Sequence, residues 1–362
     1  MNEKTIHIII GTKAELIKMS PVLRELDRRK IRYNYIDTSQ HTEITQKSRK
    51  VLEVREPDIL IGQTRKNISA IMQGFVWIWN VVDGLSKKST FKNKKGLTLV
   101  IGDTATTFLG AFMSRLHGIK VGHIEAGLRS HSFIHPFPEE IVRVTVSKMS
   151  DYMFAPYKWA YDNLKGEKGL RFNTRYNTIS DTIKFAVNKN KKPKLPKKYA
   201  LVTTHRFETI FNRERLEKVV NIMERAAKKI PVLFVMHDPT RKRLAEYGLL
   251  EKIEKNPGII IAPIYGYLEW VQVEKNAEFI LIDGGSIQEE SYYLNVPCCL
   301  LRNKTERREG LGENVLISEL KDEKINYFLD NYKKFRRKKF NPNFSPSKYI
   351  VDLIVEKALI NK

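Results

Sequence analysis

The chain alternates short apolar segments, rich in Ile, Val and Leu, with longer segments of helical periodicity. In the first half the apolar segments cover residues 5–11, 33–38, 97–103 and 120–126, and residues 14–29 form an amphipathic segment. Near-continuous apolar strands that alternate with helices are typical of a parallel sheet covered on both faces. The first half therefore predicts a doubly wound, Rossmann-like α/β domain.

The alternation restarts after a charged segment with two prolines, which reads as a linker. The predicted organisation is an N-terminal domain at 1–187, a linker at 188–198, a C-terminal Rossmann-like domain at 199–345, and an amphipathic helix within 346–362 that packs back onto the first domain. Two such sheets facing a central cleft would place the carboxyl ends of their strands along it. Ligands of α/β proteins bind at such ends.

Composition supports two globular domains. The chain has 362 residues, of which 42% are hydrophobic and 10% aromatic, enough to fill two cores. The densest apolar run, residues 75–82, is far shorter than the roughly 18 residues that a membrane span needs, and the start does not resemble a signal peptide. We expect a cytoplasmic protein. The adjacent Cys298 and Cys299 would point to opposite faces of a strand, which favours buried side chains over a disulfide or metal pair.

The formal net charge of +23 calls for an explanation, because basic proteins often bind nucleic acid or phosphorylated molecules. The lysine-rich clusters lie at residues 87–95, 189–198 and 333–340, between periodic segments. No zinc-finger, leucine-zipper or RNA-binding strand motif accompanies them. We expect a solvated basic surface, with nucleic-acid binding as the less favoured alternative.

Reactive side chains follow the predicted strands of the first half. Gly11 to Glu15 form a glycine turn that opens a helix, where backbone N–H groups and Lys13 can hold an anion. Asp103 follows the strand at 97–101 and is either a helix N-cap or a base. Glu125 ends an apolar strand and must find a partner or water.

Residues 123–140 hold an unusual mixture of acids, imidazoles and a Pro-Phe-Pro corner. After the corner, Glu139 and Glu140 begin a predicted helix, with Arg143 one turn later. Carboxylates in a first turn either stabilise the helix dipole or serve as acid and base groups. Both interpretations stay open from these residues alone.

The second half places histidines and a glycine-serine turn at strand ends. His205 and His237 each follow an apolar strand, and residues 283–290 read DGGSIQEE. Gly284, Gly285 and Ser286 would present N–H groups and a hydroxyl to a phosphate at a helix N-terminus. Glu289 and Glu290 could accept hydrogen bonds from a pair of sugar hydroxyls. The next segment, residues 304–314, is basic and glycine-bearing and suits a diphosphate.

These motifs occur in the order found in one enzyme family. They are GTKAELIKMSPV, SQH, GDT, HIEAGLRS, PFPEE, THR, DGGSIQEE and TER. The combination of HIEAGLR, PFPEE and IQEE is specific. The chain resembles the non-hydrolysing UDP-N-acetylglucosamine 2-epimerases, whose relatives have the GT-B fold with UDP on the second domain and the sugar in the cleft.

The resemblance implies an isomerase that interconverts UDP-N-acetylglucosamine and UDP-N-acetylmannosamine by eliminating UDP and adding it back with C2 inverted. It implies no metal or redox cofactor, a UDP-N-acetylhexosamine substrate, a homodimer and a role in polysaccharide supply. The matching positions are catalytic Asp103, Glu125, Glu139 and His205; substrate-binding Lys13, Lys18, Arg143, His237, Gly285, Ser286, Glu290 and Arg307; and a regulatory sugar site at Gln40 and His41.

Some positions depart from the family pattern. Lys13 stands where the family has arginine and loses its bidentate fork. The hydroxyl of the family's DSGG moves to Ser286, and the segment GLGENVLIS resembles hydrolysing relatives. The alternatives are a hydrolysing 2-epimerase, an epimerase of a modified acetamido UDP-sugar, a GT-B glycosyltransferase and a basic nucleic-acid-binding protein.

Overall fold

The computed structural model describes the chain as two compact units. It covers residues 4–38, 42–62, 70–92, 94–130, 138–305, 307–337 and 343–356. Unit 1 comprises residues 1–182 and 343–362, and unit 2 comprises residues 183–342. The boundary lies within helix α7 (Ile179–Lys189), a few residues before the segment that the sequence marks as a linker.

Unit 1 is built on a parallel sheet of seven strands in the order β3-β2-β1-β4-β5-β6-β7. The strands are β1 (Thr5–Ile10), β2 (Tyr33–Asp37), β3 (Ile59–Leu60), β4 (Gly96–Ile101), β5 (Lys120–Ile124), β6 (Tyr152–Ala155) and β7 (Leu170–Asn173). Every named pair is parallel, with Ile101 of β4 opposite Ile124 of β5. The near-continuous apolar runs of β1 and β4 are fully buried, as expected of strands that helices cover on both faces.

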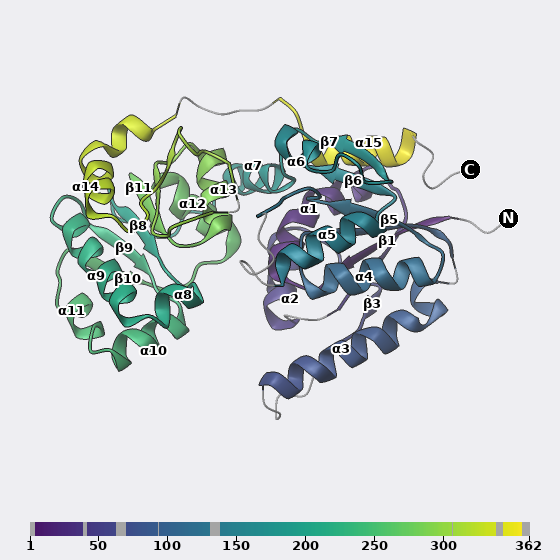
Figure 1. The fold of residues 1–362 in the computed structure, drawn as a ribbon, viewed down its shortest axis with the longest axis horizontal. Coiled ribbons are helices and arrows are strands. Elements are labelled where there is room, and N and C mark those ends of the chain that lie inside the picture. Colours follow the sequence, from purple (N-terminus) through teal and green to yellow (C-terminus); the bar gives the residue numbers. More distant parts are fainter. Residues whose placement is uncertain are drawn as a thin grey trace. The chain divides into compact units, whose positions relative to one another are not determined.

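The helices of unit 1 cover this sheet (Figure 1). They are α1 (Lys13–Arg28), α2 (Thr42–Val51), α3 (Ala70–Ser86), the 3-10 helix η1 (Lys88–Phe91), α4 (Ala105–Leu116), α5 (Glu139–Met149), α6 (Lys158–Asp162), the first residues of α7, and α15 (Pro346–Glu356). One core cluster joins Ile9, Val100 and Val121 of the sheet to side chains of α3, α4 and α5. These side chains of α3, α4 and α5 are thus buried against the sheet.

The last described helix, α15, belongs to unit 1 although the whole of unit 2 precedes it in the chain. It packs against α1, as the yellow and purple ribbons show (Figure 1), and Arg29 forms an ion pair with Asp352 at 2.6 Å. Its apolar side chains Ile350, Val351 and Ile354 are buried. The segment at 343–356 therefore completes the core of the first unit.

Unit 2 repeats the architecture with a parallel sheet of six strands in the order β10-β9-β8-β11-β12-β13. The strands are β8 (Ala200–Thr203), β9 (Val232–Val235), β10 (Ile259–Ala262), β11 (Phe279–Ile282), β12 (Cys298–Leu300) and β13 (Val315–Ile317). The helices are α8 (Phe207–Ile210), α9 (Arg213–Ala227), α10 (Asp238–Glu246), α11 (Leu250–Glu254), α12 (Tyr267–Asn276), α13 (Gly285–Leu294), α14 (Asp322–Asn331) and the 3-10 helix η2 (Tyr332–Phe335). Cys298 and Cys299 are both buried and unbridged, and they enter different core clusters, as their alternation on a strand predicts.

In both units the strand order reverses between the first strand and the fourth. The reversal falls between β1 and β4 in unit 1 and between β8 and β11 in unit 2. This doubly wound order confirms the predicted α/β fold of two Rossmann-like units. A ligand crevice is expected outside the carboxyl ends of the strands at such a switch point. None of the helices formed by the described residues is long and apolar enough to cross a membrane.

Acid should destabilise the protein through its buried histidines. His7 and His123 are fully buried, and burial lowers the pKa of each from 6.5 to about 4. Below pH 6.5 the unfolded chain binds these protons while the folded chain does not, so unfolding becomes easier until pH reaches about 4. In His123→Gln the glutamine amide can still donate to the Gly102 carbonyl, but it cannot titrate. Between pH 7 and pH 4 this variant should therefore lose about 3 kcal/mol less unfolding free energy than the native protein.

Urea unfolding followed by circular dichroism at several pH values measures this difference. The matched control is His117→Gln, because His117 is only half-buried and also hydrogen-bonds a backbone carbonyl, that of Leu85. An acid dependence that is the same in His123→Gln and the native sequence would contradict the prediction.

Candidate functional site

The glycine turn at the switch point of unit 1 binds the protein's own carboxylate. The N–H groups of Gly11 and Thr12 both donate to Glu15 Oε2 at 2.8 Å, and the hydroxyls of Thr104 and Thr107 donate to Oε1. A side chain at Gly11 would collide with the hydroxyls of neighbouring threonines, which explains the glycine. The prediction that these N–H groups hold an external anion is therefore wrong, because Glu15 already occupies them. Burial raises the pKa of Glu15.

Glu125 is held by a cation and an amide. The Lys18 ammonium lies 2.5 Å from Glu125 Oε2, and the Asn177 amide donates to Oε1 at 2.8 Å. Both charged side chains are largely removed from water, with 13% of Lys18 and 2% of Glu125 exposed. Glu125 has a φ of 68°, a left-handed conformation that non-glycine residues rarely adopt outside constrained sites. The turn after β5 thus aims this carboxylate back at α1.

Asp103 and Glu140 share one arginine. Arg143 of α5 donates to Asp103 Oδ2 at 2.8 Å through Nε and at 2.5 Å through a terminal nitrogen, and to Glu140 Oε2 at 3.1 Å. The backbone N–H of Ser130 adds a second donor to Glu140. Arg143 is buried, whereas 30% of the Asp103 side chain remains exposed. Glu140 is therefore a structural anchor, and Asp103 presents a carboxylate to solvent.

Glu139 differs from the other acids of unit 1. It is the first residue of α5, where no side chain caps the helix, and its Oε2 atom is buried without a hydrogen-bond partner. Three carboxylates of unit 1 were predicted to be catalytic. Asp103 and Glu125 each contact a cation among the described residues, and Glu139 does not. An unpartnered carboxylate oxygen is available to accept a proton.

In unit 2 the two strand-end histidines meet. The rings of His205 and His237 are 4.9 Å apart between centroids and inclined by 33°. Asp283, buried after β11, accepts hydrogen bonds from the Thr204 hydroxyl and from the backbone N–H groups of His205 and Arg206. Burial lowers the pKa of His205, although the Asp283 carboxylate partly opposes this. His205 is therefore neutral at pH 7 and presents a ring nitrogen beside the turn at Gly284.

Helix α13 begins at this turn without a side-chain cap. Gly284 is its N-cap residue, Gly285 is the first helical residue, and no side chain hydrogen-bonds there. Ser286 in the first turn is exposed. The open helix N-terminus and the exposed hydroxyl make a position that attracts an anion. It lies at the switch point between β8 and β11. Its topological counterpart in unit 1 is the N-terminus of α4, which the Thr104 side chain caps.

The two acids of α13 have separate partners. Glu289 is fully buried and lies 2.5 Å from the guanidinium of Arg307, which is itself 7% exposed. Because the Arg307 guanidinium is buried in this ion pair, its position does not support the prediction that it binds a diphosphate. Glu290 accepts a hydrogen bond from the Trp270 indole at 3.3 Å and is 4% exposed.

Two sets of predicted residues need separate mention. Gln40 and His41, assigned to a regulatory sugar site, lie outside the described residues. Lys13 is the first residue of α1 and is half-buried. The described residues hold no group of three or more His, Cys, Asp or Glu side chains arranged to bind a metal ion.

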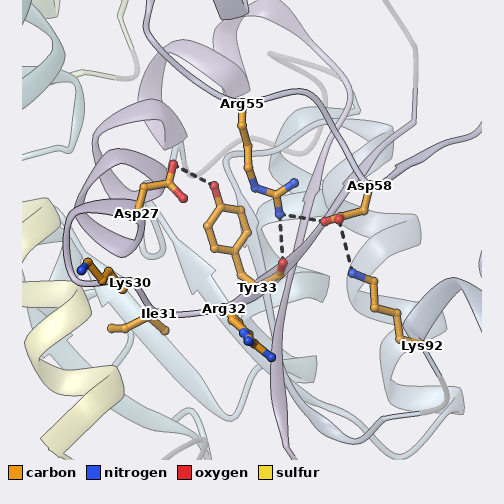
Figure 2. Close-up of a pocket in the computed structure, with 8 residues that line it drawn as sticks. All are labelled: Asp27, Lys30, Ile31, Arg32, Tyr33, Arg55, Asp58 and Lys92. Carbon is orange, nitrogen blue, oxygen red and sulfur yellow. Dashed lines mark hydrogen bonds and ion pairs between the residues drawn. The ribbon is translucent and has the colours of Figure 1, made fainter.

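The cavity that Figure 2 shows in unit 1 is separate from this site. Its walls come from the amino-terminal end of β2 and the neighbouring turns, the sheet edge opposite to Asp103 and Glu125. Its charges largely satisfy one another: Arg55 and Lys92 pair with Asp58, and the Tyr33 hydroxyl donates to Asp27. None of the predicted site residues lines it.

Sequence reasoning missed several residues that build the site. Asn177 was given no role, and Glu15 was assigned to a turn rather than to its cap. Asp283 was treated as the start of a glycine turn, although it anchors three donors. The available signal for Asp283 was its position directly after an apolar strand, as at Asp103. For Glu15 the signal was the Thr-x-x-Glu spacing of a capping box.

Comparisons with known proteins find one family along most of the chain. A family model described as UDP-N-acetylglucosamine 2-epimerase matches residues 24–347. A UDP-N-acetylglucosamine 2-epimerase of Methanococcus maripaludis is 40% identical over 85% of this chain and 86% of its own. A structure of Methanocaldococcus jannaschii UDP-GlcNAc 2-epimerase in complex with UDP-GlcNAc and UDP has a TM-score of 0.80 and 31% identity, with 97% of this chain and 99% of that chain covered.

A further solved structure is similar over the same extent. The Neisseria meningitidis UDP-GlcNAc 2-epimerase bound to UDP-GlcNAc has a TM-score of 0.83 and 26% identity, with 97% of this chain and all of that chain covered (100%). The similarity thus includes both units and the helix that follows them.

The ion pair of Lys18 and Glu125 should be a stability determinant. Lys18→Met would leave a buried carboxylate without its cation and should lower the free energy of unfolding by about 3 kcal/mol. The double variant Lys18→Met/Glu125→Gln should recover most of this loss, because no charge stays uncompensated. Urea unfolding measures both.

The matched control is Lys158→Met, which breaks an exposed pair with Asp162. It should cost less than about 1 kcal/mol, since exposed ion pairs contribute little. If Lys18→Met costs no more than this control, the buried pair is not the determinant.

Proposed function

The chain belongs to the UDP-N-acetylglucosamine 2-epimerase family, and on that premise we propose that it interconverts UDP-N-acetylglucosamine and UDP-N-acetylmannosamine without net hydrolysis. The family is one of isomerase-type enzymes. The observation that carries the proposal is a division of chemistry between the carboxyl ends of the two sheets. Unit 1 places carboxylates at its strand ends, and unit 2 leaves a helix N-terminus open to an anion.

The proposed reaction is an elimination followed by an addition. A base takes the proton from C2 of the sugar while the C1–O bond breaks, and UDP leaves with the electron pair of that bond. The carbon skeleton then holds a double bond between C1 and C2. UDP adds back to C1 as a proton is delivered to the opposite face of C2, so atoms and charge balance over the cycle. This chemistry needs carboxylates near C2 and positive potential at the diphosphate.

The contacts in unit 1 favour Glu139 as the base that removes the C2 proton. Lys18 and Asn177 engage both oxygens of Glu125, and Arg143 engages Asp103. The buried Glu139 Oε2 has no hydrogen-bond partner among the described residues. In this proposal Asp103 and Glu125 handle the proton on the other face, and Lys13, Lys18 and Arg143 supply positive charge.

The contacts in unit 2 favour a nucleotide-binding site. The open N-terminus of α13 and the exposed Ser286 suit the diphosphate, and the neutral His205 is placed to donate a hydrogen bond beside it. Glu290 suits the ribose hydroxyls, which need an acceptor. The solved relative from Methanocaldococcus jannaschii with UDP and UDP-GlcNAc bound supports a nucleotide-sugar ligand.

Solvent deuterium should enter C2 during turnover. Purified protein incubated with UDP-N-acetylglucosamine in heavy water should incorporate deuterium at C2, detected by proton NMR. Glu139→Gln removes the proposed base and should lower the incorporation rate about 10²-fold to 10⁴-fold. The control Asp162→Asn alters an exposed carboxylate of the same unit and should retain the native rate.

The outcome decides among the alternatives. Incorporation by Glu139→Gln within tenfold of the native rate would assign the base elsewhere. Free N-acetylmannosamine with an equal amount of UDP would establish the hydrolysing reaction, and transfer of labelled sugar to an acceptor would establish a glycosyltransferase. No turnover and no UDP binding by the native protein would refute the family's activity for this chain.

We also propose that the protein forms a homodimer through α3 and the adjacent α4. On α3 the side chains of Met72, Phe75, Ile78 and Trp79 are 43% to 74% exposed, and Phe112 and Leu116 of α4 are 41% and 65% exposed. These helices pack against one another (Figure 1). A chain with a net charge of +23 repels its copies, so an apolar face with few charges is the surface on which two copies can meet.

Trp79→Glu should convert the dimer to a monomer. The charge would be buried without a partner at the interface, so the mass measured by light scattering should fall to half of the native value. Leu170→Glu is the matched control, because Leu170 is a 58% exposed apolar residue of β7, outside α3 and α4. A native monomer, or a Trp79→Glu dimer, would contradict the proposed interface.

A further inference from the structure

Two buried carboxyl groups lie side by side in unit 2. Glu274 of α12 and Glu290 of α13 are within hydrogen-bonding reach of each other. Glu274 is fully buried, whereas Glu290 is 4% exposed. The Trp270 indole donates to Glu290 at 3.3 Å and also lies near Glu274, whose two buried oxygens form no hydrogen bond of their own among the described residues. The pair therefore has an outer carboxyl group that holds the indole donor and an inner one that does not.

Anionic and neutral groups surround the pair. The ionisable groups that interact with it are Tyr267, Glu289, Tyr199 and Cys298. Glu289 is compensated by Arg307, and no described Lys, Arg or His forms an ion pair with Glu274 or Glu290. The inner carboxyl group thus has no cation to stabilise a negative charge, and the nearby Trp270 indole donates its hydrogen bond to Glu290 instead.

Two neighbouring carboxyl groups cannot both ionise in such surroundings at neutral pH. Burial raises the pKa of Glu274 well above its ordinary value, and the adjacent Glu290 raises it further. Burial also raises the pKa of Glu290, to a smaller extent because its donors oppose the shift. The arrangement holds one proton on the inner group and one negative charge on the outer group.

We propose that Glu274 is a positioning residue, which donates its proton to Glu290 and so orients the outer carboxylate as the acceptor for the ribose hydroxyls of UDP. This role rests on the proposed function, because it requires UDP at Glu290. A protonated acid is suited to the task, since it supplies the donor that this part of the core lacks. An apolar side chain at position 274 would leave Glu290 with the Trp270 indole and the nearby Tyr267 hydroxyl.

The pair should make nucleotide binding sensitive to alkali. Below the raised pKa of the pair the shared proton is present and Glu290 stays oriented. As pH rises through that value the proton is lost, the two carboxylates repel each other, and the binding of the dianionic diphosphate becomes weaker. Glu274→Gln keeps a donor and cannot ionise, so it should bind UDP as the native protein does at pH 7 and lose the alkaline decline.

The test uses two measurements on the full chain. Infrared difference spectra should show the carbonyl stretch of a protonated carboxylic acid at pH 7 in the native protein, which Glu274→Gln removes. Titration calorimetry with UDP at several pH values should show Glu274→Leu binding about tenfold more weakly at pH 7, as expected for a lost hydrogen bond to a charged group. Glu251→Gln, which alters an exposed carboxylate of the same unit, should change neither measurement.

Each outcome is decisive. A native protein without the carboxylic acid band would overturn the shared proton. Equal UDP affinity of the native protein and Glu274→Leu at every pH, or an unchanged alkaline decline in Glu274→Gln, would overturn the positioning role. A native protein that shows the band but binds no UDP would refute the proposed function and confine Glu274 to a structural role.

Discussion

Parallel strand pairing is the constraint on which both candidate sites depend. Because β4 and β5 run in register, with Ile101 opposite Ile124, the chain emerges from both strands at the same edge of the sheet. Asp103 and Glu125 then follow within two residues of those ends. Gly102, with a φ of 79°, makes the turn after β4 in a left-handed conformation that glycine adopts without strain. The register thus brings together acids that are far apart in the sequence.

The same constraint explains what the sequence could predict. In unit 1, apolar periodicity located β1, β2, β4 and β5 but not the short strands β3, β6 and β7. The polar residues that follow apolar strands located Asp103, Glu125, His205 and the turn at Gly284. The partners of these residues could not be predicted in the same way. Lys18 lies 107 residues before Glu125, and only the packing of α1 on the sheet brings them together. The Glu274 and Glu290 pair likewise depends on how α12 lies against α13, which no local pattern specifies.

The two units use one architecture for different purposes. At the switch point of unit 1, the helix N-terminus is closed by Glu15, and the surrounding side chains are acids with their cations. The N-terminus of α4, on the other side of that switch point, is capped by Thr104. At the switch point of unit 2, Asp283 organises the backbone while α13 stays uncapped. A closed N-terminus repels further anions and an open one attracts them. The positive end of the helix dipole therefore binds the protein's own carboxylate in unit 1, whereas in unit 2 it is open to a ligand.

The return of α15 to unit 1 has a consequence for synthesis on the ribosome. Unit 2 is one continuous stretch of chain, so it can fold as soon as it has emerged. Unit 1 is interrupted, and the surface of α1 that receives Ile350, Val351 and Ile354 stays uncovered until all of unit 2 has been synthesised. The nascent protein therefore carries an incomplete unit 1 throughout the production of unit 2, and a stop codon just before α15 would damage the unit whose synthesis began first.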